Sequence, residues 1–495
     1  MVIRRATNIC AALVIVVLTV LAGAGGASSA VPSPIDPAML PEDGPPAPPQ
    51  PTEQRTLCVP AVAGGDGADI PRSQQDLGFD SVWSITRGAG QRIAVIDTGV
   101  SRHPRLPALE GGGDYVGTSD GTDDCDSHGT VVAGLIAAEQ VDGSGFSGAA
   151  PDAQIISIRQ SSAAFSVAGQ REDPAVAENS SGYGNVDTMA LAVRHAADLG
   201  ASVINISEVA CKPAGDGIND QRLGAAIEYA TIAKNAVVVA AAGNVGSGGC
   251  KNQNPPPDPL DPQADPWNSV TTIASPAWYD DYVLTVGSVD PNGTASSFSL
   301  GGPWVDVAAP GTGIISLHPT SPGLTNGVYG SDGAVQSFNG TSFAAPYVAA
   351  TAALVRSVHP ELTALQVMQR IEATAHAPAQ GWNPYVGHGV IDPLAAVTGE
   401  LAPGERVKVN HQSVTIDPLA AVTGELAPGE RVKVNHQSVT IDPLPTPPTP
   451  DNRSRDAALV GAGTVGTLAL LTLLASMPIR RAIRRRLPER RDVDL

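Results

Sequence analysis

The sequence predicts an α/β domain built on a mostly parallel central sheet. Continuous apolar, β-branched runs, typical of strands buried on both faces, alternate with longer segments of helical periodicity. Gly and Pro number 53 and 43, which excludes a coiled coil and indicates many turns. The expected strands are Arg92–Ile96, Gln154–Arg159, Ser202–Ile206, Ala236–Ala241, Val283–Val289 and Val305–Ala308. The expected helices are Thr130–Glu139, Asp187–Leu199, Asp220–Lys234, Phe343–Val358 and Ala364–Thr374.

The net charge of −19 is unevenly distributed along the 495 residues. Residues 1–30 carry +2 and residues 478–495 carry +4, which leaves −25 for the segment between them. Nucleic-acid binding needs clustered Lys and Arg, so an acidic chain of this kind is not expected to bind nucleic acid. Each basic end lies beside an apolar run, which indicates contact with a membrane.

Residues 1–30 are expected to form a secretory signal peptide. A short apolar run at 11–24 follows Arg4 and Arg5, and small residues at 28–30 fit cleavage near Ala30. The alternative is an uncleaved N-terminal anchor.

A second apolar run, residues 457–477, is expected to form one C-terminal transmembrane helix. Its 21 residues carry no charge, and a helix of that length spans about 31 Å, enough to cross a bilayer. The basic tail at 478–495 follows at once, so the positive-inside rule makes it cytoplasmic and places the preceding chain outside the membrane. The alternative, a buried core helix, is disfavoured by the arginines.

Cysteine usage agrees with export. Cys10 is lost with the signal peptide, and an even number remains. Two disulfides are therefore expected, with three possible pairings. The four remaining cysteines are Cys58, Cys125, Cys211 and Cys250. They form no Cys-x-x-Cys pair, so a zinc site is not expected, and no other motif indicates a metal or a cofactor.

Several segments outside the expected elements have distinct compositions. Residues 31–70 form a Pro-rich N-terminal extension, expected to be extended and polyproline-like. Residues 254–266 are expected to form a surface loop, and residues 161–185 a long exposed insertion. The aspartates at 120–126 lack the spacing of a calcium loop and are interpreted as solvated.

Residues 401–456 comprise duplicated sequence and a Pro-rich linker. The segment 391–415 recurs without change at 416–440, which indicates either a recent tandem duplication or an artefact of the sequence. Two copies are too few for a solenoid. The Pro-rich stretch at 441–451 is interpreted as a spacer from the bilayer.

Four polar residues lie at the ends of expected elements, each in a Gly-containing motif. Asp97 ends a strand in IAVIDTGV, and His128 precedes a helix in SHGTVVAG. Asn244 follows a strand in AAGN, and Ser342 begins a helix in NGTSFAAP. The carboxyl ends of parallel strands and helix N-termini are where such sheets place functional groups. Each residue alone is weak support for a catalytic site, but the chain order Asp, His, Ser matches one known type of serine-protease triad.

These four blocks resemble the signature blocks of the subtilase family. The resemblance covers roughly residues 70–400, and the catalytic domain is expected at 71–400. It implies a subtilisin-like three-layer fold and serine endopeptidase activity. Ser342 would be the nucleophile, His128 the general base and Asp97 its orienting partner. Asn244 and the Ser342 backbone N–H would form the oxyanion hole.

The resemblance also suggests a substrate-binding strand and a disulfide pairing. Where subtilases usually have a Ser-Leu-Gly-Gly-like strand beside the S1 pocket, this chain has other residues. They are Ser207, Glu208, Val209 and Ala210. Side chains in place of glycines should narrow S1, unless the loop is displaced to accommodate Cys211. The expected disulfides are Cys211–Cys250 and Cys58–Cys125, the second tying the extension to the rim of the active site.

Within the subtilases the chain resembles the mycosins, membrane-anchored proteases of mycobacterial type VII (ESX) secretion systems. The resemblance rests on PTEQRTLC at 51–58, DCDSHGT at 124–130, NISEVAC at 205–211 and the C-terminal span with its arginines. It implies an actinobacterial envelope location, exported proteins as substrates and the secretion membrane complex as a partner. A structural role in that complex is the second function considered. The extension is expected to wrap the catalytic domain without being removed.

Overall fold

The structure, a computed structural model, describes residues 30–400 except 65–66, 170–181, 248, 259, 262–263 and 331. It also describes the backbone of two short strands, β16 (Val407–Val409) and β17 (Gln412–Val414), which pair antiparallel. The predicted signal peptide up to residue 29, the second repeat copy, the spacer, the span at 457–477 and the basic tail lie outside these residues. Within the described part of the chain, no helix is both long and apolar enough to cross a bilayer.

A seven-stranded sheet forms the centre of the domain, and every neighbouring pair in it is parallel. This confirms the mostly parallel sheet predicted from the apolar runs. In spatial order the strands are β12 (Val307–Pro310), β11 (Leu284–Val289), β9 (Val237–Ala241), β7 (Val203–Ile206), β3 (Arg92–Asp97), β5 (Gln154–Arg159) and β4 (Leu109–Asp114). The edge strand β4 was not predicted, because its sequence LEGGGD has no apolar β-branched run.

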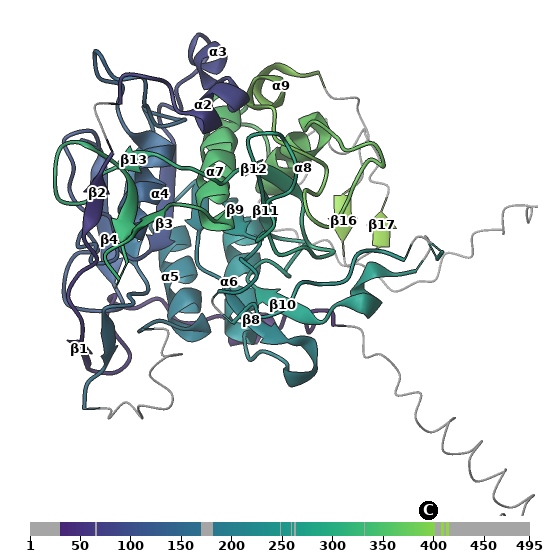
Figure 1. The fold of residues 1–495 in the computed structure, drawn as a ribbon. Coiled ribbons are helices and arrows are strands. Elements are labelled where there is room, and N and C mark those ends of the chain that lie inside the picture. Colours follow the sequence, from purple (N-terminus) through teal and green to yellow (C-terminus); the bar gives the residue numbers. More distant parts are fainter. Residues whose placement is uncertain are drawn as a thin grey trace, which may run out of the picture. The chain divides into compact units, whose positions relative to one another are not determined.

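Helices cover both faces of the sheet, as the three-layer expectation requires (Figure 1). In β3, Ile93 and Val95 face one hydrophobic core, and Ala94 and Ile96 face the other. The first core is shared with α4 (His128–Ala137) and α7 (Thr341–Val358), and the second with α5 (Val186–Asp198) and α6 (Gln221–Glu228). Alternation of side chains along a strand buried on both faces produces these two cores.

Most helix boundaries agree with the predictions to within two residues. Helix α8 (Ala364–Thr374) has the predicted boundaries, and its N-cap Thr363 forms a capping box with Gln366. The predicted helix 220–234 divides into α6 and a π-helical turn, η4 (Tyr229–Ala233). The remaining helical segments are η1 (Pro37–Met39), α2 (Arg72–Leu77), α3 (Phe79–Trp83), η3 (Ala214–Asp216), η5 (Pro266–Ser269) and α9 (Pro393–Thr398).

Short strands around the domain were not predicted, because none of them contains an apolar run longer than three residues. They are β1 (Thr52–Gln54), β2 (Ala61–Ala63), β6 (Phe165–Val167), β8 (Ala210–Pro213), β10 (Thr272–Ser275), β13 (Ser316–Leu317), β14 (Leu324–Tyr329) and β15 (Val335–Ser337). Strand β1 pairs with β6, and β2 pairs with β14. Both pairings join the N-terminal extension to the domain.

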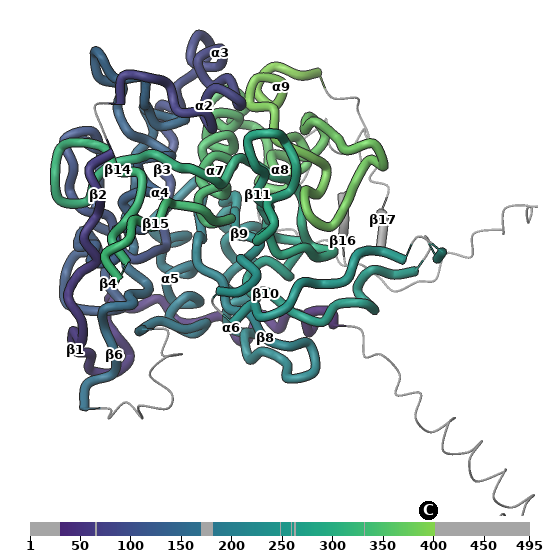
Figure 2. The backbone as a smooth tube through the Cα atoms, in the orientation of Figure 1, coloured from purple at the N-terminus to yellow at the C-terminus, as the bar shows by residue number. Residues whose placement is uncertain are grey.

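The N-terminal extension runs along the surface of the domain as an extended segment with one 3₁₀ turn, η1 (Figure 2). The Asp43 carboxylate lies 2.9 Å from His195 Nδ1 on α5. Further along, the Gly64 amide donates to the Leu324 carbonyl at 2.7 Å. The extension is therefore bound to the domain at several separate points, as expected for a segment that wraps around it.

Two loop predictions need correction. The insertion 161–185 was expected to be exposed, but Ser162, Ala164 and Tyr183 are buried, because strand β6 and the bridge between Ser162 and Tyr183 hold its ends to the domain. The loop 254–266 is largely on the surface, but Asn254 is buried. Its side-chain oxygen accepts hydrogen bonds from the amides of two following residues, Thr271 and Thr272.

Candidate active site

Asp97 is the last residue of β3, a strand near the middle of the sheet. Its side chain is fully buried. The Oδ1 atom accepts hydrogen bonds from the Thr98 amide at 2.8 Å and from His128 Nδ1 at 2.7 Å. The structure therefore places the carboxylate at the carboxyl edge of the sheet and joins it to the imidazole.

His128 is the first residue of α4, and the turn before the helix fixes its position. Ser127 has a φ of 67°, a left-handed conformation that is uncommon for a residue with a side chain. At Gly129, an added Cβ would lie 2.0 Å from the Gly99 carbonyl oxygen. Only glycine permits this close approach, which brings the start of α4 against the turn that follows Asp97.

Ser342 is the second residue of α7, and its Oγ lies 2.9 Å from His128 Nε2. The side chain of His128 is 24% exposed and Ser342 is 7% exposed, whereas Asp97 is completely buried. The hydrogen-bonded series from Asp97 through His128 to Ser342 thus leads from the protein interior to a position that solvent can reach.

Asn244 lies beside the N-terminus of α7. Its Oδ1 accepts hydrogen bonds from the Thr341 amide at 2.9 Å and from the Thr341 hydroxyl at 3.1 Å. A Cβ added to Gly340 would lie 3.0 Å from Ser342 Oγ and 3.3 Å from Asn244 Nδ2. The free side of Gly340 therefore faces both the Ser342 hydroxyl and the Asn244 amide nitrogen.

Asp124 holds the start of α4 in place. Its carboxylate accepts hydrogen bonds from the Thr130 amide at 2.9 Å, the Thr130 hydroxyl at 2.6 Å and the Thr98 hydroxyl at 2.9 Å. Burial raises the pKa of Asp124 to about 6, although these hydrogen bonds oppose the rise. The interpretation of residues 120–126 as solvated is therefore wrong for Asp124 and for Asp126, whose carboxylate accepts from Ser162 and Ala163.

The electrostatic environment of His128 is strongly negative. Burial alone lowers the pKa of the imidazole, whereas the charge and hydrogen bond of Asp97 raise it. Together with the charges of Glu208 and Asp124, they raise the pKa of His128 to about 9. The site therefore favours the imidazolium that forms when the histidine accepts a proton.

The predicted substrate-binding strand, residues 207–210, lies next to the candidate nucleophile. The Ser207 hydroxyl donates to the Ser342 carbonyl oxygen at 2.9 Å and accepts from Asn205 Nδ2 at 2.9 Å. Val209 packs partly against both hydrophobic cores, and Ala210 begins β8. Glu208 points toward the Asp97 and His128 side chains, since one side-chain oxygen or nitrogen of each lies within 4.8 Å of the others.

Both expected disulfides are present. Cys58–Cys125 joins the N-terminal extension to the segment that precedes His128, and Cys211–Cys250 joins β8 to the loop that follows β9. A Cβ added to Gly243 would lie 3.2 Å from Cys250 Sγ, so the second disulfide packs against the residue that precedes Asn244.

The four residues predicted from the motifs, Asp97, His128, Asn244 and Ser342, come together at this edge of the sheet. Sequence reasoning missed two residues that support them, Thr98 and Asp124, which position the start of α4. It assigned Glu208 to substrate binding and did not place this side chain beside the imidazole. Asp124 was detectable in principle as a carboxylate just before a helix, a common capping pattern, whereas the position of Glu208 depends on the path of its loop.

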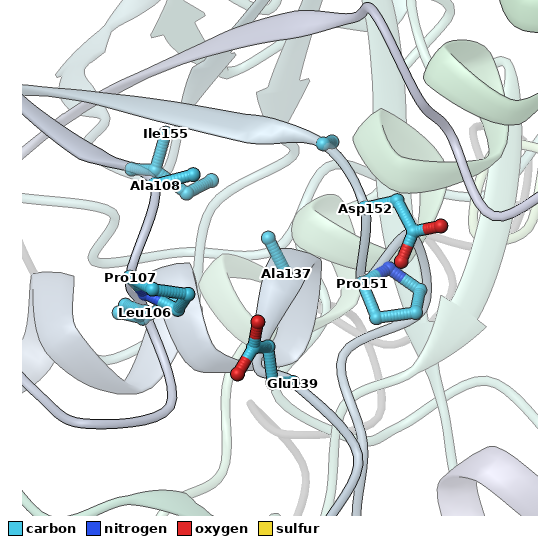
Figure 3. A pocket seen from close by; sticks show the side chains of 9 residues that line it. Leu106, Pro107, Ala108, Ala137, Glu139, Pro151, Asp152 and Ile155 are labelled. Atoms are coloured by element: carbon cyan, nitrogen blue, oxygen red, sulfur yellow. The ribbon is translucent and has the colours of Figure 1, made fainter.

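A separate cavity of about 170 Å³ lies at the opposite end of the sheet (Figure 3). Figure 3 shows Ala137 at the C-terminal end of α4, Glu139 two residues beyond the helix, and Ile155 near the start of β5. Because β3 and β5 are parallel, with Ile93 opposite Ile155 and Asp97 opposite Arg159, this cavity is a strand length away from Asp97. It contributes no residue to the candidate active site.

Comparison with known proteins agrees with this geometry. The family described as the subtilase family matches residues 88–389. Mycosin-4 of Mycobacterium tuberculosis is 54% identical over 396 residues, which cover 79% of this chain and 84% of that protein. A solved structure of the serine protease MycP1 is described as an essential component of the type VII (ESX-1) secretion system. It is 47% identical to this chain with a TM-score of 0.68, and the match covers 74% of this chain and 99% of the MycP1 chain.

A third relative belongs to a larger assembly. A chain in the structure of the periplasmic assembly from the ESX-5 inner membrane complex is 45% identical, with a TM-score of 0.71, and the match covers 78% of this chain and 98% of that one. The fold, the extent of the family match and the identity to the mycosins agree with one another. The chain therefore belongs to the subtilase family of serine proteases and, within that family, to the mycosins.

Proposed function

We propose that this protease cleaves peptide bonds of exported proteins through Ser342, at the outer face of the membrane to which it is anchored. The observation that carries the proposal is the hydrogen-bonded series from Asp97 Oδ1 to His128 and from His128 Nε2 to Ser342 Oγ, at 2.7 and 2.9 Å. A nucleophile and a base within hydrogen-bonding reach, with the base oriented by a third group, is the arrangement needed for acyl transfer.

In the proposed mechanism, Ser342 Oγ attacks the scissile carbonyl while His128 Nε2 accepts the hydroxyl proton. Asp97 holds Nδ1–H in place and stabilises the imidazolium. His128 then donates the proton to the leaving amine, and the acyl-enzyme ester forms on Ser342. Water, activated by the same imidazole, hydrolyses this ester and restores the hydroxyl.

The negative charge that develops on the carbonyl oxygen would be stabilised by two donors. Asn244 Nδ2 faces the space beside Gly340, as does Ser342 Oγ. The backbone N–H of Ser342 lies in the first turn of α7, where amides lack partners within the helix and the helix dipole is positive. These donors are fixed before the substrate binds, so little reorganisation is needed when charge develops.

The residues 207–210 would form one wall of the S1 pocket. The Ser207 hydroxyl is tied to the Ser342 carbonyl, which fixes this segment relative to the nucleophile. Val209 and Ala210 carry side chains at the two positions where subtilases usually have glycines, so we infer a narrow pocket that accepts small P1 residues.

The membrane anchor and the secretion complex are further parts of the proposal. The apolar segment 457–477, followed by seven arginines among residues 478–495, supports a single span with a cytoplasmic C-terminus and an extracytoplasmic protease domain. The relative found in the ESX-5 periplasmic assembly supports a type VII secretion membrane complex as the partner. A structural role in such a complex is compatible with proteolysis.

Expression of Ser342→Ala in cells separates the proteolytic role from a structural role in the secretion complex. If the protease acts on exported proteins, this variant leaves them uncleaved. Secretion that persists in the variant but is lost when the whole chain is deleted would show an additional structural role. Normal processing of exported proteins by Ser342→Ala would contradict the proposed function.

The N-terminal extension would remain part of the mature enzyme. Its support is structural: the Cys58–Cys125 disulfide, the β1–β6 and β2–β14 pairings and the Asp43–His195 contact all tie it to the domain. N-terminal sequencing of purified active protein is expected to find a start near residue 31. A mature N-terminus between residues 70 and 90 would contradict this part of the proposal.

A further inference from the structure

Glu208 lies over the edge of the sheet that carries Asp97. It follows β7, which is one neighbour of β3, while Ser161 follows β5, the other neighbour. The Ser161 side chain donates a hydrogen bond to the Glu208 carboxylate. Since β3 runs between β7 and β5, this hydrogen bond connects the two loops that flank the carboxyl end of β3, where Asp97 is located.

The Glu208 carboxyl, the Asp97 carboxylate and the His128 imidazole form one compact cluster. One side-chain oxygen or nitrogen from each lies within 4.8 Å of the other two. The Asp97 side chain is completely buried, and its Oδ2 makes no hydrogen bond to the protein. Two carboxyl groups therefore share a small, poorly solvated space with a single group that can carry positive charge.

Other charges face this cluster but are already bound by polar donors. Asp124 acts on His128 and accepts hydrogen bonds from Thr130 and Thr98. Asp126 acts on Glu208 and accepts from a hydroxyl and an amide. Arg159, a cation at the same edge of the sheet, acts on Asp126 and forms an ion pair with Asp114 at 3.6 Å. Among the charged groups that act most strongly on Glu208, which are Asp97, His128 and Asp126, only the imidazole can carry a positive charge.

We propose that Glu208 is a positioning residue of the active site, a second acidic partner of His128 that controls how readily the imidazole releases its proton. The proposal rests on the proposed role of His128 as general base. It assigns Glu208 no contact with the reacting atoms and no proton transfer, because its effect is exerted through the charge beside the ring.

The titration of the cluster agrees with this role. Burial and the charge of Asp97 raise the pKa of Glu208 to about 7, against the opposing effect of His128. Above that pH Glu208 is ionised, and its charge is one of the causes that raise the pKa of His128 to about 9. An opposite charge at 4–6 Å favours the protonated imidazole, so its removal must favour the neutral base.

Glu208→Gln tests the proposal in the full-length protein. The amide oxygen of glutamine can still accept the Ser161 hydrogen bond, so the variant removes the charge and keeps the contact. We expect the acid limb of the pH profile of kcat/KM to move to lower pH by roughly one unit, which is about a tenfold gain in kcat/KM on that limb. The ring signals of His128, followed by NMR during a pH titration, should move by the same amount.

Glu139→Gln is the matched control, because Glu139 is exposed at the far end of α4. It should leave both the pH profile and the His128 titration unchanged. If His128 titrates at the same pH in wild type and in Glu208→Gln, the proposal is overturned. Glu208 would then serve only to hold the loop. The proposed catalytic function fails separately. If His128 of the wild-type protein titrates as expected but the protein cleaves no peptide at any pH, the catalytic function is contradicted and the Glu208 result remains valid.

Discussion

His128 Nε2 lies 2.9 Å from Ser342 Oγ, although 214 positions separate the two residues in the chain. Helices α4 and α7 present them from the same side of the sheet, and each residue lies in the first turn of its helix. The contact therefore depends on the packing of two helix N-termini against the carboxyl edge of the sheet.

Removal of the Ser342 hydroxyl should abolish catalysis without unfolding the protein. We expect Ser342→Ala to lower kcat by about 10⁶, the loss seen when the nucleophile of such a triad is removed. Thermal unfolding should remain close to that of wild type, since only one oxygen atom is removed. The kinetic assay uses a peptide substrate, and a variant that retains a tenth of wild-type kcat would contradict the role of Ser342.

Loss of the Asn244 amide donor should reduce kcat more than it changes KM. Asn244→Ala is expected to lower kcat by about 10²–10³, because the missing donor acts on charge that develops in the transition state. Asn244 also accepts from Thr341, so Asn244→Asp serves as a second variant that keeps the acceptor and loses the donor. An effect on KM alone, in both variants, would rule out an oxyanion role.

The pH dependence of the wild-type enzyme should be displaced toward alkaline pH. A general base must be neutral, and the pKa of His128 is raised to about 9. The value of kcat/KM should therefore rise with pH and reach half of its maximum near pH 9, rather than near the ordinary histidine value of about 6.5. A profile measured with a neutral peptide substrate that is already flat from pH 7 would contradict this electrostatic account.

The Cys58–Cys125 disulfide should contribute substantially to stability. It closes a loop with a sequence separation of 67, and the chain-entropy model assigns such a cross-link roughly 4 kcal/mol of unfolding free energy. The double variant Cys58→Ser, Cys125→Ser should therefore unfold at markedly lower denaturant concentration. A midpoint equal to that of wild type would show that the extension is held by its strand pairings alone.

Cleavage-site profiling should reveal a preference for small P1 residues. The residues at 207–210 carry side chains, whereas glycines in this segment would leave a wider S1 pocket. A library of peptides that vary only at P1 measures the preference directly. Efficient cleavage after large aromatic residues would contradict the narrow pocket and would favour a displaced loop around Cys211.

Much of the fold follows from local sequence patterns. Strands such as β3 and β5 are apolar runs buried on both faces, so their sequences report their environment directly. The edge strand β4 is largely glycine, and it forms because β5 offers an unpaired edge, which no local pattern reveals. The strand pairings of the N-terminal extension also depend on partners far away in the chain.

The main residues of the candidate site could also be predicted from local sequence patterns. Asp97, His128, Asn244 and Ser342 lie at element ends within Gly-containing motifs, and parallel topology brings such ends to one edge. The partly buried position of Asp124 and the proximity of Glu208 to His128 arise from loop conformations. Composition suggested only an acidic, solvated loop around Asp124, whereas the structure uses its carboxylate to anchor α4.

Covalent labelling of the full-length protein tests the central claim, that Ser342 is a nucleophile activated by His128. The protein would be treated with a fluorophosphonate, which reacts with activated serine hydroxyls, and the adduct located by peptide mass spectrometry. The account predicts one adduct, on Ser342, formed by wild type and lost in His128→Ala. Labelling of Ser342 that is equally rapid in His128→Ala, or a reactive serine elsewhere in the chain, would contradict it.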